Sequence, residues 1–204
     1  MSKLYFRYGV MGCSKTANAL MCKFNFEQQG FKVLLLKSLI DTRDVKDNNI
    51  IVHSRIGLES PCIGFSSDDN LIDIFKAECQ KEKYDIIIVD ECQFATAKQI
   101  EQLKQISLTN IVMCYGLLTN FQTYLFEGSK RLVELADSLQ ELKSVCKCGK
   151  KASVNARFVN GKLCTNGDSI AIENENNVTY EPMCYGCYIK MVEKADENNE
   201  NTII

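Results

Sequence analysis

The chain of 204 residues lacks several features that mark particular classes of protein. It has no apolar run near the roughly 18–20 residues of a membrane span, and its first residues lack the apolar core of a signal peptide. It also lacks a basic run, and its net charge of −2 and pI near 5.6 argue against a nucleic-acid surface. There are no internal repeats. We therefore expect a cytoplasmic protein that binds neither nucleic acid nor membrane.

The order of apolar segments predicts an α/β fold. An apolar fraction of 46% and this length suit one α/β domain with a small appendage. Strands alternate with amphipathic helices, which indicates a parallel sheet with right-handed crossovers. Strands are expected before Gly9 and at 31–37, 50–56 (an edge), 86–90 and 110–116, and helices at 17–27, 70–83, 96–105 and 129–142. Residues 192–204 are acidic and rich in asparagine, and we expect a disordered tail there.

A phosphate-binding loop is indicated by the stretch Gly9-Val-Met-Gly-Cys-Ser14-Lys15-Thr16. The pattern G-x-x-x-x-G-K-[ST] wraps backbone N–H groups around phosphates, brings the lysine to the outer phosphates and places the hydroxyl on a metal ion. A helix that follows such a loop adds its dipole to anion binding. Ser14 replaces the second glycine of the pattern. If this position requires a positive φ, serine adds backbone strain that glycine avoids.

The run Ile86-Ile-Ile-Val-Asp90-Glu91 predicts a buried parallel strand that ends at a binding site. Ligands of open α/β sheets bind at the carboxyl ends of the strands. One carboxylate there can hold magnesium through water, and its neighbour can accept a proton. The alternative is a strand that simply stops at solvent-facing charges. The phosphate-loop candidate favours the nucleotide site.

Eleven cysteines in a cytoplasmic chain are interpreted as thiols and metal ligands, not as a disulfide framework. Two close pairs, Cys146 with Cys148 and Cys184 with Cys187, predict a tetrahedral zinc site. Four protein ligands leave no open position, so this zinc would be structural. It would hold the segment 150–183, which has too little apolar content to fold alone. Cys164, inside that segment, is an alternative ligand.

These motifs together resemble the zinc-containing, cellular-type (type II) thymidine kinases, and most closely the bacterial members. The likeness runs from Tyr5 to about Met191, and its most specific parts are residues 53–61, 90–94, 114–121, 126–129 and 142–152. The resemblance implies a P-loop (RecA-like) parallel sheet flanked by helices, with a small zinc-bound lasso domain. The corresponding division is a nucleotide-binding domain over 1–143 and a lasso domain over 144–191, followed by the tail.

The resemblance also implies ATP-dependent phosphorylation of the 5′-hydroxyl of thymidine, in deoxynucleoside salvage. Glu91 matches the general base, Lys15 and Arg43 match the other catalytic residues, and Thr16 and Asp90 would hold magnesium. ATP contacts are implied for Gly9, Val10, Met11, Gly12, Cys13, Ser14, Lys15, Thr16, Asp90, Glu91, Cys92 and Gln93. Nucleoside contacts are implied for Asp41, Arg43, Phe94, Phe121, Arg157 and Tyr180. The family further implies a homotetramer inhibited by thymidine triphosphate.

Departures from the family pattern leave alternatives open. Ser14 in the phosphate loop and Ile172-Glu-Asn174 in the lasso touch both substrate sites. They motivate a second hypothesis, a nucleotide-binding homologue with little or no kinase activity that acts as a regulator or as an oligomer subunit. A third is an ATPase coupled to a partner. Without the resemblance, Phe94 and Phe121 are equally well core aromatics, and Arg157 is a solvated charge.

Overall fold

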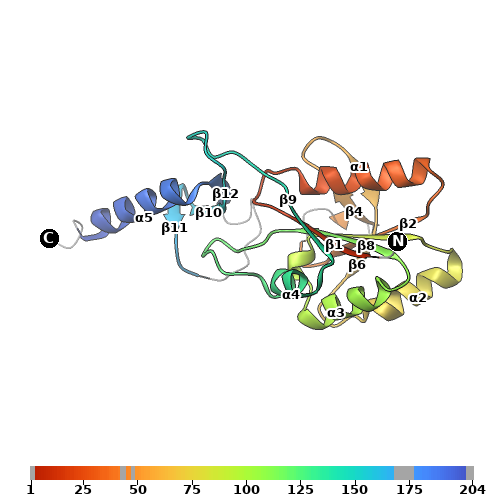
Figure 1. Ribbon diagram of the computed structural model, residues 1–204. Helices are drawn as coiled ribbons and strands as arrows, with labels where there is room; N and C mark the ends of the chain where they lie inside the picture. Colours follow the sequence, from red (N-terminus) through yellow and green to blue (C-terminus); the bar gives the residue numbers. More distant parts are fainter. Residues whose placement is uncertain (1–2, 42–44, 47–48, 168–176, 201–204) are drawn as a thin grey trace. The chain divides into compact units, whose positions relative to one another are not determined.

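Two compact units form the chain in the computed structural model, which describes residues 3–41, 45–46, 49–167 and 177–200 (Figure 1). The first unit contains Met1–Tyr8, Ser14–Leu118 and Phe126–Leu142. The second contains Gly9–Cys13, Thr119–Leu125 and Lys143–Ile204. The short segments 9–13 and 119–125 thus group with the C-terminal stretch. A division of the sequence into consecutive domains does not predict this grouping.

A six-stranded parallel sheet forms the centre of the first unit. Its order is β6-β2-β7-β8-β1-β9. The strands are β1 (Lys3–Tyr8), β2 (Val33–Ser38), β6 (Ile63–Phe65), β7 (Ile86–Asp90), β8 (Ile111–Gly116) and β9 (Ser138–Glu141). Every residue of β2 and β7 is buried, as expected for inner strands covered on both faces. The predicted α/β class is confirmed.

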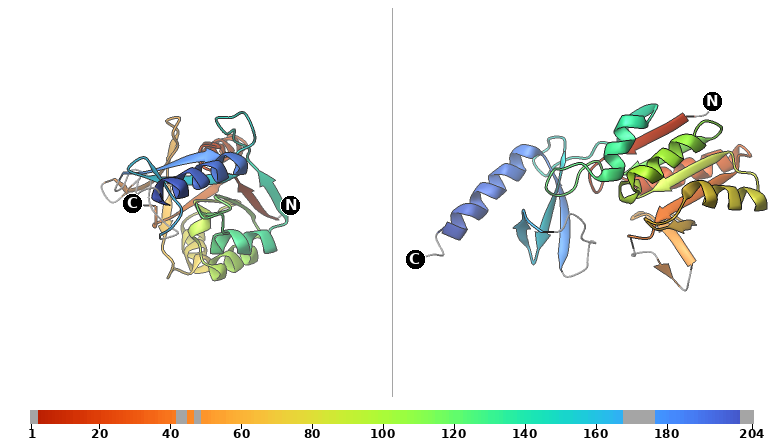
Figure 2. Two further views of the ribbon diagram at one scale, coloured as in Figure 1. Left: turned by 90° about the vertical axis from the view of Figure 1, so that its left-hand side faces the viewer. Right: turned by 90° about the horizontal axis from the view of Figure 1, so that it is seen from below.

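Helices cover both faces of this sheet. They are α1 (Lys15–Gln28), α2 (Leu71–Lys81), α3 (Ala97–Ile106) and α4 (Glu127–Leu135). Figure 1 shows α1 on one face and the other three on the opposite face, which Figure 2 (right) views directly. Two apolar clusters fill the layers, one beneath α1 and one beneath α2, α3 and α4. In open sheets covered in this way, ligands bind at the carboxyl ends of the strands.

Side-chain caps fix the starts of two predicted helices. The Asn70 side chain accepts a hydrogen bond from the Ile72 amide (3.0 Å) at the start of α2. Thr96 and Gln99 form a reciprocal capping box at the start of α3. These caps satisfy N–H groups that have no partner within the helix. The helices predicted at 70–83 and 96–105 are confirmed.

The structure corrects the extent of one predicted helix and the position of one predicted strand. The helix expected at 129–142 ends at Leu135, because Asp137 exchanges hydrogen bonds with the backbone of Leu4 and leads into β9 at the sheet edge. The strand expected at 50–56 is present as β4 (Asn49–His53). Its expected edge position is wrong, because β4 pairs antiparallel with β3 (Val45–Lys46) on one side and with β5 (Glu59–Pro61) on the other. The two edge positions of the main sheet belong to β6 and β9.

The second unit contains a three-stranded antiparallel sheet in the order β11-β10-β12, followed by α5. The elements are β10 (Val154–Val159), β11 (Lys162–Cys164), β12 (Val178–Met183) and α5 (Tyr185–Glu200). α5 runs through 192–200, where disorder was expected, because glutamate, lysine and alanine favour continuation of the helix. In the described part of the chain, no helix combines the length and apolar content needed to cross a bilayer.

Candidate active site and metal centre

The first turn of α1 begins directly after a residue in the left-handed conformation. Ser14 has φ 62° and ψ 32°, and α1 starts at Lys15. This is the positive φ that the glycine of the phosphate-loop pattern accommodates without strain, so serine at this position does carry a conformational cost. The Ser14 carbonyl accepts the Asn18 amide at 2.9 Å, which continues the helical hydrogen bonding back to the loop.

The strand β7 brings its acids to the start of α1. The Thr16 hydroxyl donates to a carboxylate oxygen of Asp90 at 3.1 Å, although 74 positions separate the two residues. Burial, reinforced by the charge of neighbouring Glu91, raises the pKa of Asp90 from 3.8 to about 7, while the Thr16 hydrogen bond and Lys37 oppose this rise. The Asp90 carboxyl is therefore only partly ionised near neutral pH, and a cation or further hydrogen-bond donors would favour its charged form.

Glu91 follows Asp90 in a strained conformation and is held by Gln93. Its φ is 51°, an uncommon value for a residue with a side chain, and such strain gathers at functional sites. The side-chain nitrogen of Gln93 donates to the Glu91 carboxylate at 2.6 Å, and the side-chain oxygen of Gln93 accepts a hydrogen bond from the Leu117 backbone amide at 3.0 Å. A Cβ at Gly116 would lie 2.5 Å from that oxygen, so glycine makes room for the arrangement. Glu91 thus has a fixed orientation.

A buried ion pair lies at the carboxyl end of β2, and the sequence reasoning missed its lysine. Lys37 contacts Asp41 at 3.2 Å with both side chains almost fully buried. Lys37 lies opposite Asp90 in the register of β2 and β7, which places a positive charge beside the two acids. The signal was a single lysine directly after the apolar run 33–36, within the same buried strand. Arg43, the third predicted catalytic residue, lies outside the described residues.

Asn155 of β10 connects two segments of the second unit, and this residue too was missed. Its carboxamide oxygen accepts the Met11 amide at 2.7 Å, and its nitrogen donates to the Thr119 carbonyl at 3.1 Å. The side chain is buried, so both bonds form away from water. They explain why 9–13 and 119–125 group with the C-terminal stretch. No motif in the sequence identified Asn155.

The predicted nucleoside residues occupy different environments. In the first unit, Phe94 is half-buried and packs edge-on against Phe126, with ring centroids 5.9 Å apart. In the second unit, the Arg157 guanidinium lies 3.5 Å from the centre of the Phe121 ring, and both residues are buried. The interpretation of Arg157 as a solvated charge is therefore wrong. Tyr180 is half-buried on β12.

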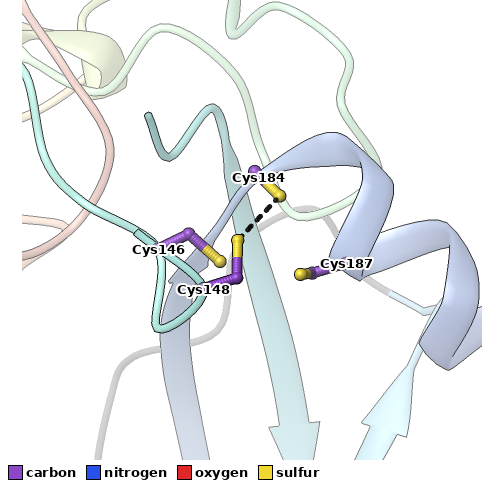
Figure 3. A group of neighbouring side chains, drawn as sticks. All are labelled: Cys146, Cys148, Cys184 and Cys187. Carbon is purple, nitrogen blue, oxygen red and sulfur yellow. Dashed lines mark hydrogen bonds between the residues drawn. The ribbon is translucent and has the colours of Figure 1, made fainter. Parts of the chain in front are cut away.

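The four cysteines predicted as metal ligands converge in the second unit (Figure 3). All four sulfur atoms of Cys146, Cys148, Cys184 and Cys187 lie within 4.8 Å of one another, and the Cys148 and Cys184 sulfurs are 3.6 Å apart. A zinc ion with four Zn–S bonds of about 2.3 Å requires sulfur separations of about 3.8 Å. The donor set therefore fits tetrahedral zinc, and no fifth position is needed.

Local backbone geometry presents these thiols together. The first pair flanks a tight turn in which the Gly149 amide donates to the Cys146 carbonyl at 2.8 Å and Gly149 has φ 86°. The second pair spans the junction of β12 with the first turn of α5. Backbone N–H groups lower the pKa of Cys146 to about 6, which favours the thiolate that zinc requires. Cys164, the alternative ligand, instead donates to the Asn166 carbonyl at 2.9 Å.

Comparison with known proteins gives one consistent family. A family model described as thymidine kinase matches residues 2–188. A thymidine kinase of Shewanella oneidensis is 40% identical over 187 residues, which cover 90% of this chain and 95% of that protein. One of Zymomonas mobilis is 43% identical over 164 residues, covering 79% and 83%. One of Photorhabdus laumondii is 34% identical over the full length of both chains.

Proposed function

The chain belongs to the thymidine kinase family, and on this basis we propose that it transfers the γ-phosphoryl group of ATP to the 5′-hydroxyl of thymidine. The observation that carries the proposal is the contact between the Thr16 hydroxyl and Asp90, with Glu91 next in the chain. It unites the end of a phosphate-loop motif with two carboxylates at the ends of parallel strands. This is the combination that phosphoryl transfer requires.

Lys15 and the amides of the phosphate loop bind the outer phosphates of ATP in this proposal. The start of α1 at Lys15 supports it, because a helix N-terminus favours negative charge. Thr16 and Asp90 would hold the magnesium ion, and a bound magnesium ion would supply positive charge near the transferred phosphoryl group. The raised pKa of Asp90 supports this role, since a cation beside a buried carboxyl favours its ionised form.

Glu91 acts as the general base that accepts the proton of the 5′-hydroxyl. A base must be held within hydrogen-bond reach of the proton it removes, and the bond from Gln93 restricts Glu91 in that way. The family resemblance assigns the nucleoside contacts to Asp41, Phe94, Phe121, Arg157 and Tyr180. Arg43 completes the expected catalytic set. Cys92, expected near ATP, has its side chain buried in the core.

The four-cysteine centre holds zinc with a structural role. Zinc bound by four thiolates ties the loop at 146–149 to the start of α5 and so closes the base of the segment between them. Feedback inhibition by thymidine triphosphate, homotetramer formation and a cytoplasmic location are further parts of the proposal that rest on the family resemblance.

A nucleoside-dependence assay tests the proposal. The purified chain is incubated with γ-labelled ATP, magnesium and thymidine, and labelled thymidine monophosphate is separated by chromatography. We expect ADP and thymidine monophosphate in equal amounts, and no ATP consumption without nucleoside. Absence of labelled product at every enzyme concentration would overturn the proposal. ATP consumption without thymidine would favour the coupled ATPase.

The binding-only homologue keeps one supporting observation, the left-handed Ser14 in the phosphate loop. Strain there can weaken the hold on ATP without affecting the nucleoside. Calorimetry combined with the product assay separates this candidate from the kinase. A binding-only homologue should bind one ligand in the calorimeter and form no product in the assay. The Ile172–Asn174 departure bears on the same question but lies outside the described residues.

A further inference from the structure

One face of the small antiparallel sheet gathers three side chains around Arg157. In the strand register, Arg157 of β10 lies opposite Cys164 of β11 and opposite Tyr180 of β12. Directly opposed residues of neighbouring strands project from the same face of a sheet. Tyr180 and Phe121 are both expected nucleoside residues. Arg157 is thus next to one of them along the sheet and stacked on the other.

The stack of Arg157 on Phe121 is close and shielded from water. The guanidinium carbon lies 3.5 Å from the ring centre, and Arg157 is 5% exposed while Phe121 is 1% exposed. A cation is attracted to an aromatic face more strongly when both groups are shielded from water. Such an interaction can then change an equilibrium constant by about thirtyfold. The contact joins β10 to the 119–125 loop across 36 positions of sequence.

The same guanidinium also shapes the backbone that follows β11. One terminal nitrogen of Arg157 donates to the Asn166 carbonyl at 2.7 Å and to the Cys164 sulfur at 3.2 Å. A Cβ at Gly167 would lie 2.9 Å from that nitrogen, and Gly167 has φ 109°. Residues 164–167 therefore pass so close to Arg157 that a side chain at 167 would displace it. They lead directly into the stretch that the resemblance assigns to the lasso.

We propose that Arg157 is a positioning residue of the nucleoside site. It fixes the Phe121 ring and residues 164–167 to one another before thymidine binds, so less ordering remains to oppose binding. The inference rests on the proposed function and refines it. Arg157, expected as a direct nucleoside contact, acts through the groups it holds. Its effect falls on thymidine affinity and not on the chemical step.

Thymidine binding to two variants tests this role without using turnover. Arg157→Met keeps the length of the side chain and removes the planar cation, and Arg157→Lys keeps the charge without the planar stack. By calorimetry we expect both to weaken thymidine binding about tenfold to thirtyfold. In the kinase assay, kcat at saturating thymidine should change less than about threefold, and the KM for ATP should stay unchanged. Zinc content should equal that of the wild type.

The outcomes separate this inference from the proposed function. Wild-type affinity in Arg157→Met, or full rescue by lysine, overturns the positioning role alone. A wild-type chain that binds thymidine without forming product overturns the kinase proposal and leaves the affinity comparison valid. A wild-type chain that binds no thymidine overturns both.

A pair of glycine variants tests the same contact and serves if Arg157→Met does not fold. Gly161 and Gly167 both have positive φ, but a Cβ at Gly161 meets nothing within 4 Å. Gly167→Ala should therefore displace the guanidinium and weaken thymidine binding. Gly161→Ala also places a side chain at a positive φ (75° against 109° at Gly167) and should bind with wild-type affinity. Equal affinities in the two variants would contradict the inference.

Discussion

Neutralising Asp90 should stabilise the ligand-free protein while it abolishes activity. Asp90 is 3% exposed, and its pKa rises from 3.8 to about 7, chiefly through burial and secondly through the charge of Glu91. The folded state therefore keeps a proton that the unfolded state has already lost at intermediate pH. The contribution of Asp90 to stability should be fully present below about pH 4, fall as pH rises, and level off above about pH 7.

The size of this effect follows from the two pKa values. Each tenfold difference in proton affinity corresponds to about 1.4 kcal/mol of free energy. The rise of the Asp90 pKa from 3.8 to about 7 therefore changes the free energy of unfolding by at most about 4 kcal/mol. The asparagine side chain of Asp90→Asn cannot ionise, so this variant should not show the loss of stability with rising pH. At pH 8 we expect the variant to be more stable than the wild type by up to this amount, without magnesium or nucleotide.

Urea unfolding between pH 5.5 and 8 measures the difference. The chain has no tryptophan, so circular dichroism follows the transition. Asp68→Asn, at an exposed loop position, is the matched control and should leave the pH dependence unchanged. A wild type whose stability rises from pH 5.5 to 8, or an Asp90→Asn variant with the same pH dependence as wild type, would refute the reasoning.

Three further predictions concern backbone strain, metal and packing. Ser14→Gly should raise the free energy of unfolding by about 0.5–1 kcal/mol, measured in thermal melts. The reason is that glycine removes the left-handed strain, and this gain exceeds the cost of the extra conformational entropy that glycine gives the unfolded chain. A lower melting temperature would contradict this prediction. Elemental analysis should give one zinc per chain, lost in Cys187→Ser and kept in Cys79→Ser; retention in both would exclude the centre. Gly128→Ala should cost about 1–3 kcal/mol, because its Cβ would lie 2.5 Å from the Ala95 carbonyl oxygen, while Gly186→Ala, with open space, should not.

Patterns that depend on local composition predicted most of the fold. The apolar run that ends in Asp90 and Glu91 could only be a buried strand, and its burial is complete. The cysteine pairs were predicted together because zinc ligation demands a small set of residue types at short spacing. The strain at Ser14 followed from the conformation that a glycine occupies in the loop pattern.

Features that depend on distant partners could not be predicted in the same way. Arg157 is charged and would usually be solvated, and the Phe121 ring, the Asn166 carbonyl and the Cys164 sulfur help to make its burial tolerable. Asn155 contacts two segments that are remote from it in sequence. The strand β9 exists because Asp137 pairs with Leu4, while its own sequence continues a helical pattern. In each case a long-range contact overrides the local preference.

The most direct test of the account is the turnover of Glu91→Gln, which keeps the shape of the side chain and removes its ability to accept a proton. With saturating ATP, magnesium and thymidine, kcat should fall by about two to four orders of magnitude, while calorimetry shows thymidine affinity close to that of the wild type. Glu82→Gln, at the exposed C-terminal end of α2, should retain full activity. An unchanged kcat in Glu91→Gln would contradict the assignment of the general base.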